Sequence, residues 1–106
     1  MTTSGFACTM AALSRAERER HEQLALFLKG EAFQMQELTH GFAFLFAPSV
    51  ETAQLLTEFM TLERLCCPFL ELRVSFAPAQ GPLSLTLSGP EGVKPFLVAE
   101  LSLGSS

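Results

Sequence analysis

The sequence predicts an α+β domain: a mostly antiparallel four-stranded sheet with helices on one face, in the order α-ββ-α-ββ-α. Two observations support this prediction. Segments 70–76 and 83–88 alternate apolar and polar residues, as strands with one buried face do. Segments with apolar residues at helical spacing precede, separate and follow the strand pairs. With 106 residues, the chain is expected to form one domain, 1–106, with residues 1–12 as an N-terminal arm.

The first helix is expected over about residues 15–29. Ser14 and Glu17 have the spacing of a capping box, which marks its start. Gly30 is expected to end it, because glycine adopts the left-handed conformation common just after a helix.

The first hairpin is expected to pair residues 33–38 with residues 42–46 across a Thr39-His40-Gly41 turn. Phe42, Phe44 and Phe46 alternate along the second of these strands and should form one buried face.

The second helix is expected to begin at Pro48 and Ser49 and to end before Pro68. A residue that precedes proline is pushed away from helical geometry. Cys66 should therefore close this helix and Cys67 should leave it.

The second hairpin is expected from residues 70–76 and 83–88, joined through Pro78-Ala79-Gln80-Gly81. The last helix should follow Gly92, with Pro95 tolerable only in its first turn or as a kink. The apolar faces of the strands then supply the expected core, made of Phe42, Phe44, Phe46, Leu72, Val74, Leu83 and Leu85.

Composition excludes two classes of partner. The net charge of -4, with Arg15, Arg18 and Arg20 interleaved with glutamates, argues against nucleic acid. The longest apolar runs, such as 42–47, are far too short to span a membrane, and residues 1–7 lack the basic and apolar regions of a signal peptide. We therefore expect a cytoplasmic protein with no nucleic-acid or membrane partner.

The three cysteines are the most informative residues of the chain. Cys66 and Cys67 are neighbours at a predicted helix end, and Cys8 is the only other thiol. In a compartment that keeps thiols reduced, three cysteines argue against a disulfide framework and for metal binding or redox chemistry. The alternative is that all three are small buried hydrophobic residues.

Glu63 is predicted to lie in the middle of the apolar half of the second helix. It precedes Cys66 and Cys67 by three and four residues, so the three side chains can converge on one patch. Because a buried carboxylate without a partner is costly, Glu63 is a candidate ligand or organiser of a thiol proton. Alternatively, it binds backbone N–H groups of the N-terminal arm or pairs with an arginine of the first helix.

The surroundings of the thiols favour metal binding over nucleophilic chemistry. A helix C-terminus and nearby glutamates oppose thiolate formation, whereas a bound metal ion itself displaces the thiol proton. Soft ions with low coordination numbers accept two or three sulfur ligands, so Cys8 could join the pair. The spacing does not match a structural zinc framework. His40 is interpreted as a turn residue and His21 as a residue of the polar helix face.

Segments 8–13, 59–70 and 81–94 together resemble a family of small uncharacterised bacterial proteins marked by a Glu-Arg-x-Cys-Cys-Pro-Phe motif. The resemblance extends over nearly the whole chain and implies no particular activity. The positions that match the shared pattern are Cys8, Glu63, Arg64, Cys66, Cys67 and Pro68. Leu65 departs from the polar residue usual there, and Pro95 from a usual helix former.

The leading hypothesis is a soft-metal or metalloid binding protein with Cys8, Cys66, Cys67 and Glu63 as metal ligands. The ion would be mercury, arsenite, cuprous copper or zinc. The alternative is a non-enzymatic interaction or dimerisation module with structural cysteines, using an apolar outer stripe of Ala43, Leu45 and Ala47 to form a homodimer. A thiol-reductase enzyme comes third, because the chain has no Cys-x-x-Cys motif.

Overall fold

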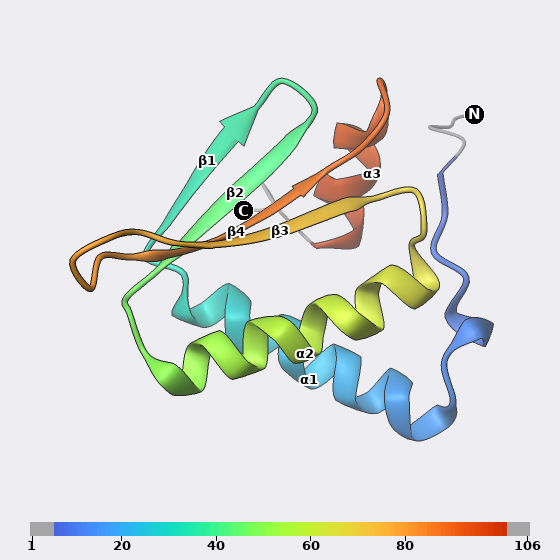
Figure 1. Ribbon diagram of the computed structural model, residues 1–106. Helices are drawn as coiled ribbons and strands as arrows, with labels where there is room; N and C mark the ends of the chain where they lie inside the picture. Colours follow the sequence, from blue (N-terminus) through green and yellow to red (C-terminus); the bar gives the residue numbers. More distant parts are fainter. Residues whose placement is uncertain (1–5, 102–106) are drawn as a thin grey trace.

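The computed structural model describes residues 6–101, which form four strands and three α-helices in the predicted order (Figure 1). After a short 3-10 turn, η1 (Met10–Ala12), the elements are α1 (Arg15–Glu31), β1 (Gln34–Leu38), β2 (Gly41–Phe46), α2 (Val50–Cys66), β3 (Glu71–Phe76), β4 (Leu83–Ser88) and α3 (Val93–Glu100). No helix within residues 6–101 is long and apolar enough to cross a membrane. The predicted fold class is confirmed.

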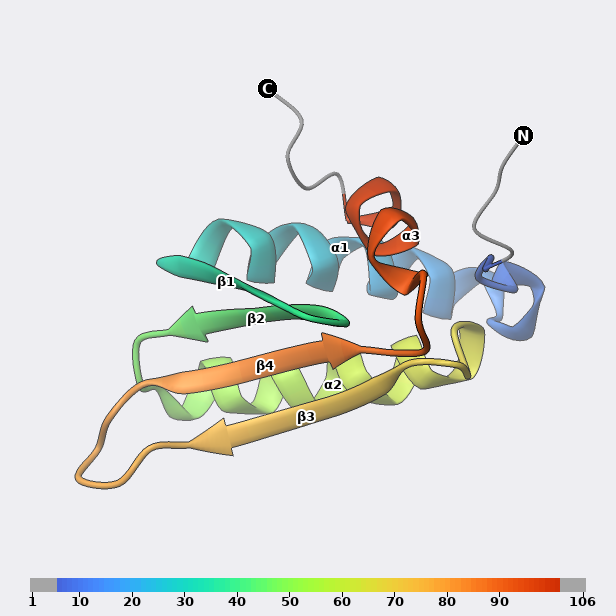
Figure 2. The same cartoon turned by 90° about the horizontal axis from the view of Figure 1, so that it is seen from above.

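The two hairpins form one antiparallel sheet with the strand order β1-β2-β4-β3. The centre is the β2–β4 pair, in which Phe44 lies opposite Leu85, and Leu85 in turn lies opposite Val74 of β3. Figure 2 shows this order, with β1 and β3 at the two edges. Rows of apolar side chains therefore run across the sheet on a single face.

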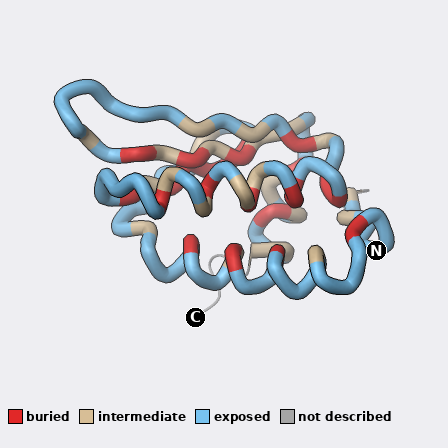
Figure 3. The backbone as a smooth tube through the Cα atoms, turned by 60° about the horizontal axis from the view of Figure 1, so that its bottom comes forward, coloured by how far each residue is buried: buried red, intermediate tan, exposed pale blue. Residues whose placement is uncertain are grey.

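The three helices pack against that apolar face. Helices α1 and α2 lie along the sheet, and α3 covers the end where β2 begins (Figures 1 and 2). Figure 3 shows the buried positions of α1, α2 and the strands turned toward one another. Five of the seven predicted core residues are buried, whereas Leu72 and Val74 are partly buried because β3 is an edge strand.

Local sequence signals explain most of the element boundaries. The Ser14–Glu17 capping box is present, and Ser49 caps α2 by accepting a hydrogen bond from the Thr52 N–H. Pro95 is the third residue of α3, where its missing N–H costs nothing.

The predicted end of the first helix at Gly30 is wrong, because α1 continues to Glu31. Ala32 ends it in an extended conformation, with its N–H donating to the Leu28 carbonyl. No left-handed residue is used there, so the glycine signal has no role at this helix end.

The outer face of the sheet offers only a narrow apolar stripe. Ala43 is already buried, flanked by Gln36 and Thr86 on the adjacent strands. Leu45 is partly buried and Ala47 is exposed. A homodimer through this face stays a prediction.

Candidate metal centre

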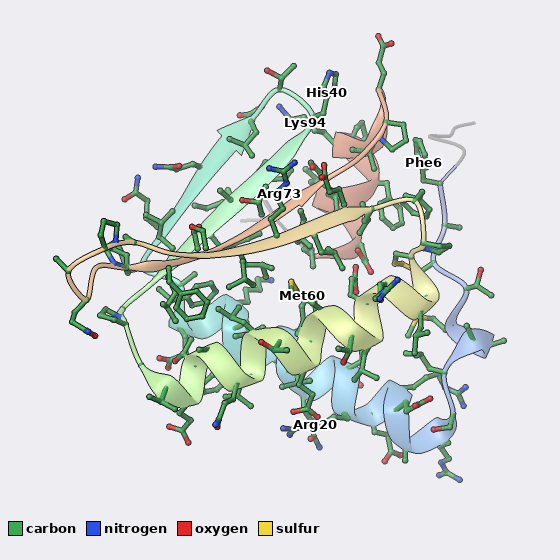
Figure 4. The ribbon with its side chains drawn as sticks, in the orientation of Figure 1. Phe6, Arg20, His40, Met60, Arg73 and Lys94 are labelled. Atoms are coloured by element: carbon green, nitrogen blue, oxygen red, sulfur yellow. A yellow bond between two sulfur atoms is a disulfide. The ribbon has the colours of Figure 1, made fainter. Side chains whose placement is uncertain are left out.

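Three segments that are distant in sequence meet at the C-terminal end of α2. The N-terminal arm is tied to it by a hydrogen bond from the Thr9 N–H to the Cys66 carbonyl, 2.8 Å long. Phe6 of the arm packs on Phe69, with ring centroids 4.9 Å apart, and Phe69 packs on Phe96 of α3 at 5.1 Å. Figure 4 shows Phe6 beside α3. This aromatic packing holds the arm, the turn after α2 and α3 together around the cysteines.

The three sulfur atoms predicted to form a site do lie together, each within 4.8 Å of the others. They are not all free thiols, however, because Cys8 and Cys67 form a disulfide with Cα atoms 4.7 Å apart. Cys66 is the free cysteine, and its Sγ lies 3.8 Å from the Cys67 Sγ. The expectation of a fully reduced three-thiol pocket is therefore corrected.

The end of α2 explains why the two neighbouring cysteines face different partners. Cys66 is the last helical residue and points into the core, where its side chain is fully buried. Cys67 has left helical geometry, with φ -125° and ψ 68°, as the following proline predicts. This conformation turns the Cys67 sulfur toward the arm and Cys8.

The surroundings of Cys66 disfavour a thiolate, as the sequence predicts. Burial and, to a smaller extent, the charges of Glu63 and Glu100 together raise the pKa of its thiol to about 11. The thiol lies 3.6 Å from the Glu63 carbonyl, to which it can donate. Cys66 is therefore protonated at neutral pH and is a poor nucleophile, but a coordinated cation would displace its proton.

Glu63 is completely buried beside these sulfurs, which confirms its predicted position. The sequence offered an arginine of the first helix or the backbone of the arm as its partner. The observed partner is instead His21 of α1. His21 Nε2 and Glu63 Oε1 are hydrogen-bonded at 2.6 Å, and the imidazole stacks on Phe59 with centroids 5.3 Å apart. The arginine next to it, Arg20, instead pairs with Glu58 at the surface.

The interpretation of His21 as a polar-face residue is wrong, because its side chain is buried. The sequence did contain a signal for this position. His21 precedes the buried residues Leu24 and Leu28 by three and seven positions, which places it on the same helix face. His40, by contrast, lies in the exposed β1–β2 turn as predicted (Figure 4).

Glu100 at the end of α3 is a site residue that the sequence analysis missed. Its Oε2 lies 3.0 Å from the Cys8 Sγ and 3.5 Å from the Cys67 Sγ. It follows the buried Val93 and Leu97 by seven and three positions, so helical spacing places it on the inner face. Its meeting with the cysteines depends on how α3 packs, which spacing alone does not predict.

The two carboxyl groups share one buried space. Glu63 Oε2 and Glu100 Oε1 are both buried, and no N–H, hydroxyl or thiol group among residues 6–101 donates a hydrogen bond to them. Burial, the charge of Glu63 and a hydrogen bond between the two carboxyl groups together raise the pKa of Glu100 to about 8. Near neutral pH, a proton held by Glu100 fills the gap between the two acceptors, and a cation could fill it instead.

The sulfur–carboxyl cluster therefore consists of Cys8, Cys66, Cys67, Glu63, Glu100 and His21. Ligand atoms of Cys8, Cys67, Glu63 and Glu100 lie within 4.8 Å of one another, and so do those of His21, Glu63 and Cys66. Arg64 and Pro68 of the motif are exposed and lie outside this set. The donor set suits soft ions through sulfur and borderline ions through mixed sulfur, nitrogen and oxygen ligands.

Comparison of the chain with family models, with curated proteins and with solved structures finds no match. The function of the protein is therefore inferred from the geometry of the sulfur–carboxyl cluster.

Proposed function

We propose that the reduced protein binds a thiophilic metal or metalloid ion through Cys8, Cys66 and Cys67, with Glu63 and Glu100 beside the ion. The observation that carries this proposal is the convergence of three sulfur atoms, from the arm and from the end of α2, within 4.8 Å of one another. Cysteines that served packing alone would not need to meet two carboxyl groups removed from water.

The redox state of the Cys8–Cys67 pair controls this site. A disulfide offers no thiolate ligand, so the oxidised protein would not bind the ion through Cys8 and Cys67. Two electrons and two protons from a dithiol reductant convert the disulfide into the two thiols of Cys8 and Cys67. These thiols and Cys66 can then release their protons to bind an ion. A reducing compartment such as the cytoplasm would keep the site open.

The ligand chemistry ranks the ions. Mercury, arsenite and cuprous copper accept two or three thiolates and are preferred over magnesium or calcium, which require oxygen ligands. Zinc would need a fourth ligand, and Glu63 or Glu100 can supply it because both carboxyl groups lie next to the sulfurs.

A second candidate is a structural role for the cysteines in a protein without a bound ion. Cys66 and Cys67 are fully buried members of the core, and the disulfide joins the arm to it. The chain would then act through a surface, as an interaction or dimerisation module. This candidate gives no role to the convergence of Glu63 and Glu100 on the sulfurs of Cys8 and Cys67.

Native mass spectrometry of the purified protein separates the two candidates. The reduced protein is expected to retain one mercury, arsenite or cuprous ion per chain, while the oxidised protein retains none. Cys67→Ser should abolish retention and Cys66→Ser should weaken it. Leu65→Ser, at an exposed neighbouring position of α2, should have no effect. If the reduced protein retains none of these ions, the metal-binding proposal fails and the structural role remains.

A further inference from the structure

An apolar cavity lies next to the sulfur–carboxyl cluster. It has a volume of about 250 Å³ and opens between α1, α3 and the inner face of the sheet. Its apolar lining includes Ala25, Phe44, Phe59 and Leu87. Its charged lining residues are Glu22 and Lys29, both exposed on α1, and Glu100.

Glu100 connects this cavity to the sulfurs. It forms part of the cavity wall, and its Oε2 lies 3.0 Å from the Cys8 Sγ and 3.5 Å from the Cys67 Sγ. Phe59 connects them from the side of α2, because it lies one helical turn before Glu63 on the same buried face. A ligand held by Cys8 and Cys67 would thus lie next to Glu100, which forms part of the wall of the apolar cavity.

We propose that this cavity receives the organic group of a thiophilic ion that carries one carbon substituent, such as an aryl arsenical. This inference rests on the proposed function, since the arsenic would be held by the thiols of the reduced site. In the binding step, the As=O group reacts with the two thiols, two As–S bonds form, and the oxygen leaves as water with both thiol protons. Arsenic stays trivalent, and its third bond remains with carbon.

The thiols that serve this ligand are Cys8 and Cys67, which touch Glu100 at the cavity wall. Arsenite has no carbon substituent and binds a third thiolate, which Cys66 supplies. The two ligands should therefore differ in their need for Cys66, although both require Cys8 and Cys67.

The cavity has a suitable size for one ring. An apolar cavity of about 150 Å³ in another protein is enough to bind benzene. Removing about 100 Å² of ring surface from water corresponds to a roughly 50- to 100-fold gain in affinity. An aryl group of this size should therefore account for a measurable share of the affinity.

The experiment measures the affinity of the reduced protein for phenylarsine oxide and for arsenite. Ala25→Phe, which fills the cavity from α1, should weaken phenylarsine oxide binding by about tenfold or more and change arsenite binding by less than about twofold. Retained arsenite binding also shows that the variant is folded. Ala25→Leu, a smaller change, should give an intermediate loss.

Ala53→Phe is the matched control. Ala53 is a partly buried helical alanine, but it lines a different groove, between the start of α2 and the β3–β4 turn. It should leave the affinity for both probes unchanged. Cys66→Ser should weaken arsenite binding while phenylarsine oxide binding persists.

The outcomes distinguish the two proposals. If the reduced protein binds arsenite, but neither Ala25 variant weakens phenylarsine oxide binding, the cavity inference is overturned and the metal site stands. If Cys66→Ser abolishes phenylarsine oxide binding, the assignment of the aryl ligand to Cys8 and Cys67 is overturned. If neither probe binds, the proposed function itself fails.

Discussion

At the scale of single residues, the buried pair of His21 and Glu63 is the feature with the largest expected energetic effect. A buried carboxylate that loses its partner leaves an uncompensated charge, which typically costs about 3–5 kcal/mol. An exposed ion pair is worth only about 0–1 kcal/mol. Adjacent residues of α1 offer both cases, since His21 pairs with the buried Glu63 and Arg20 with the exposed Glu58.

His21→Leu should therefore lower the free energy of unfolding by about 3 kcal/mol or more, because it leaves the buried Glu63 without its hydrogen-bond partner while nearly preserving side-chain volume. Arg20→Leu, one residue earlier, should lower it by less than about 1 kcal/mol. Urea unfolding of the two variants measures both values. Equal losses would show that burial of the His21–Glu63 pair has no special importance.

Residue-scale prediction from sequence succeeded where helical spacing was sufficient. Spacing places Glu63 on the buried face of α2 beside Cys66 and Cys67, and the structure confirms this. The side chains next to Glu63 come from α1 and α3. The angles and distances at which helices pack decide which side chains meet, and spacing within one helix does not predict them. Glu100 therefore had no signal that linked it to the cysteines.

At the scale of elements, the β3–β4 turn is the least favourable local conformation in the part of the chain that the structure describes. Ala79 and Gln80 have φ angles of 59° and 60°, in the left-handed region that costs residues with a Cβ about 1–2 kcal/mol each. A hydrogen bond of 3.1 Å from the Gly81 N–H to the Pro78 carbonyl closes the turn. Two consecutive left-handed residues are typical of a type I′ turn, which favours Asn-Gly.

Replacing Ala79 and Gln80 by Asn and Gly should raise the free energy of unfolding by about 1 kcal/mol, because both residues tolerate positive φ. Thermal unfolding of the double variant measures the gain. Gln36→Gly, in the middle of β1, serves as the control and should lower stability, since glycine weakens a strand interior. A double variant that is less stable than the natural turn would contradict this account.

The elements themselves were predictable because their signals are local. Alternating side chains identified both hairpins, and Ser14, Ser49 and Pro68 marked helix ends correctly. The prediction that Gly30 ends the first helix failed because glycine is also tolerated inside an exposed helical turn. Nothing lies within 4 Å of the place where a Cβ of residue 30 would be, so no close contact requires glycine at this position. The pairing of β2 with β4 joins the two hairpins into one sheet. No local signal predicts this pairing, and it was expected only because one domain should have a single core.

At the scale of the whole molecule, the Cys8–Cys67 disulfide joins the arm to the core across 59 residues of sequence. The sequence placed these cysteines in one site but predicted that they are free thiols. The reason was that an odd number of cysteines in a reducing compartment argues against a disulfide. The structure shows that one sulfur, Cys66, is left over while the other two are joined. The redox state of this pair and the position of the arm are therefore linked, and the proposed metal binding would depend on both.

This linkage predicts that the stability of the protein depends on both reductant and ion. A cross-link that closes a loop of this length contributes about 4 kcal/mol in the chain-entropy model, so reduction should lower the urea midpoint substantially. Adding arsenite to the reduced protein at about 100 times its dissociation constant should then restore about 2.7 kcal/mol, because the ion reconnects the arm to α2.

A Cys8→Ser, Cys67→Ser double variant is the control for both effects. It has neither the disulfide nor two of the three sulfur ligands, so its urea midpoint should respond neither to reductant nor to arsenite. If the unmodified protein has the same urea midpoint in its oxidised and reduced forms, the disulfide does not stabilise the folded protein. A midpoint that falls on reduction but does not recover with arsenite would assign the cysteines to structure alone, because an ion that binds only the folded site must stabilise it.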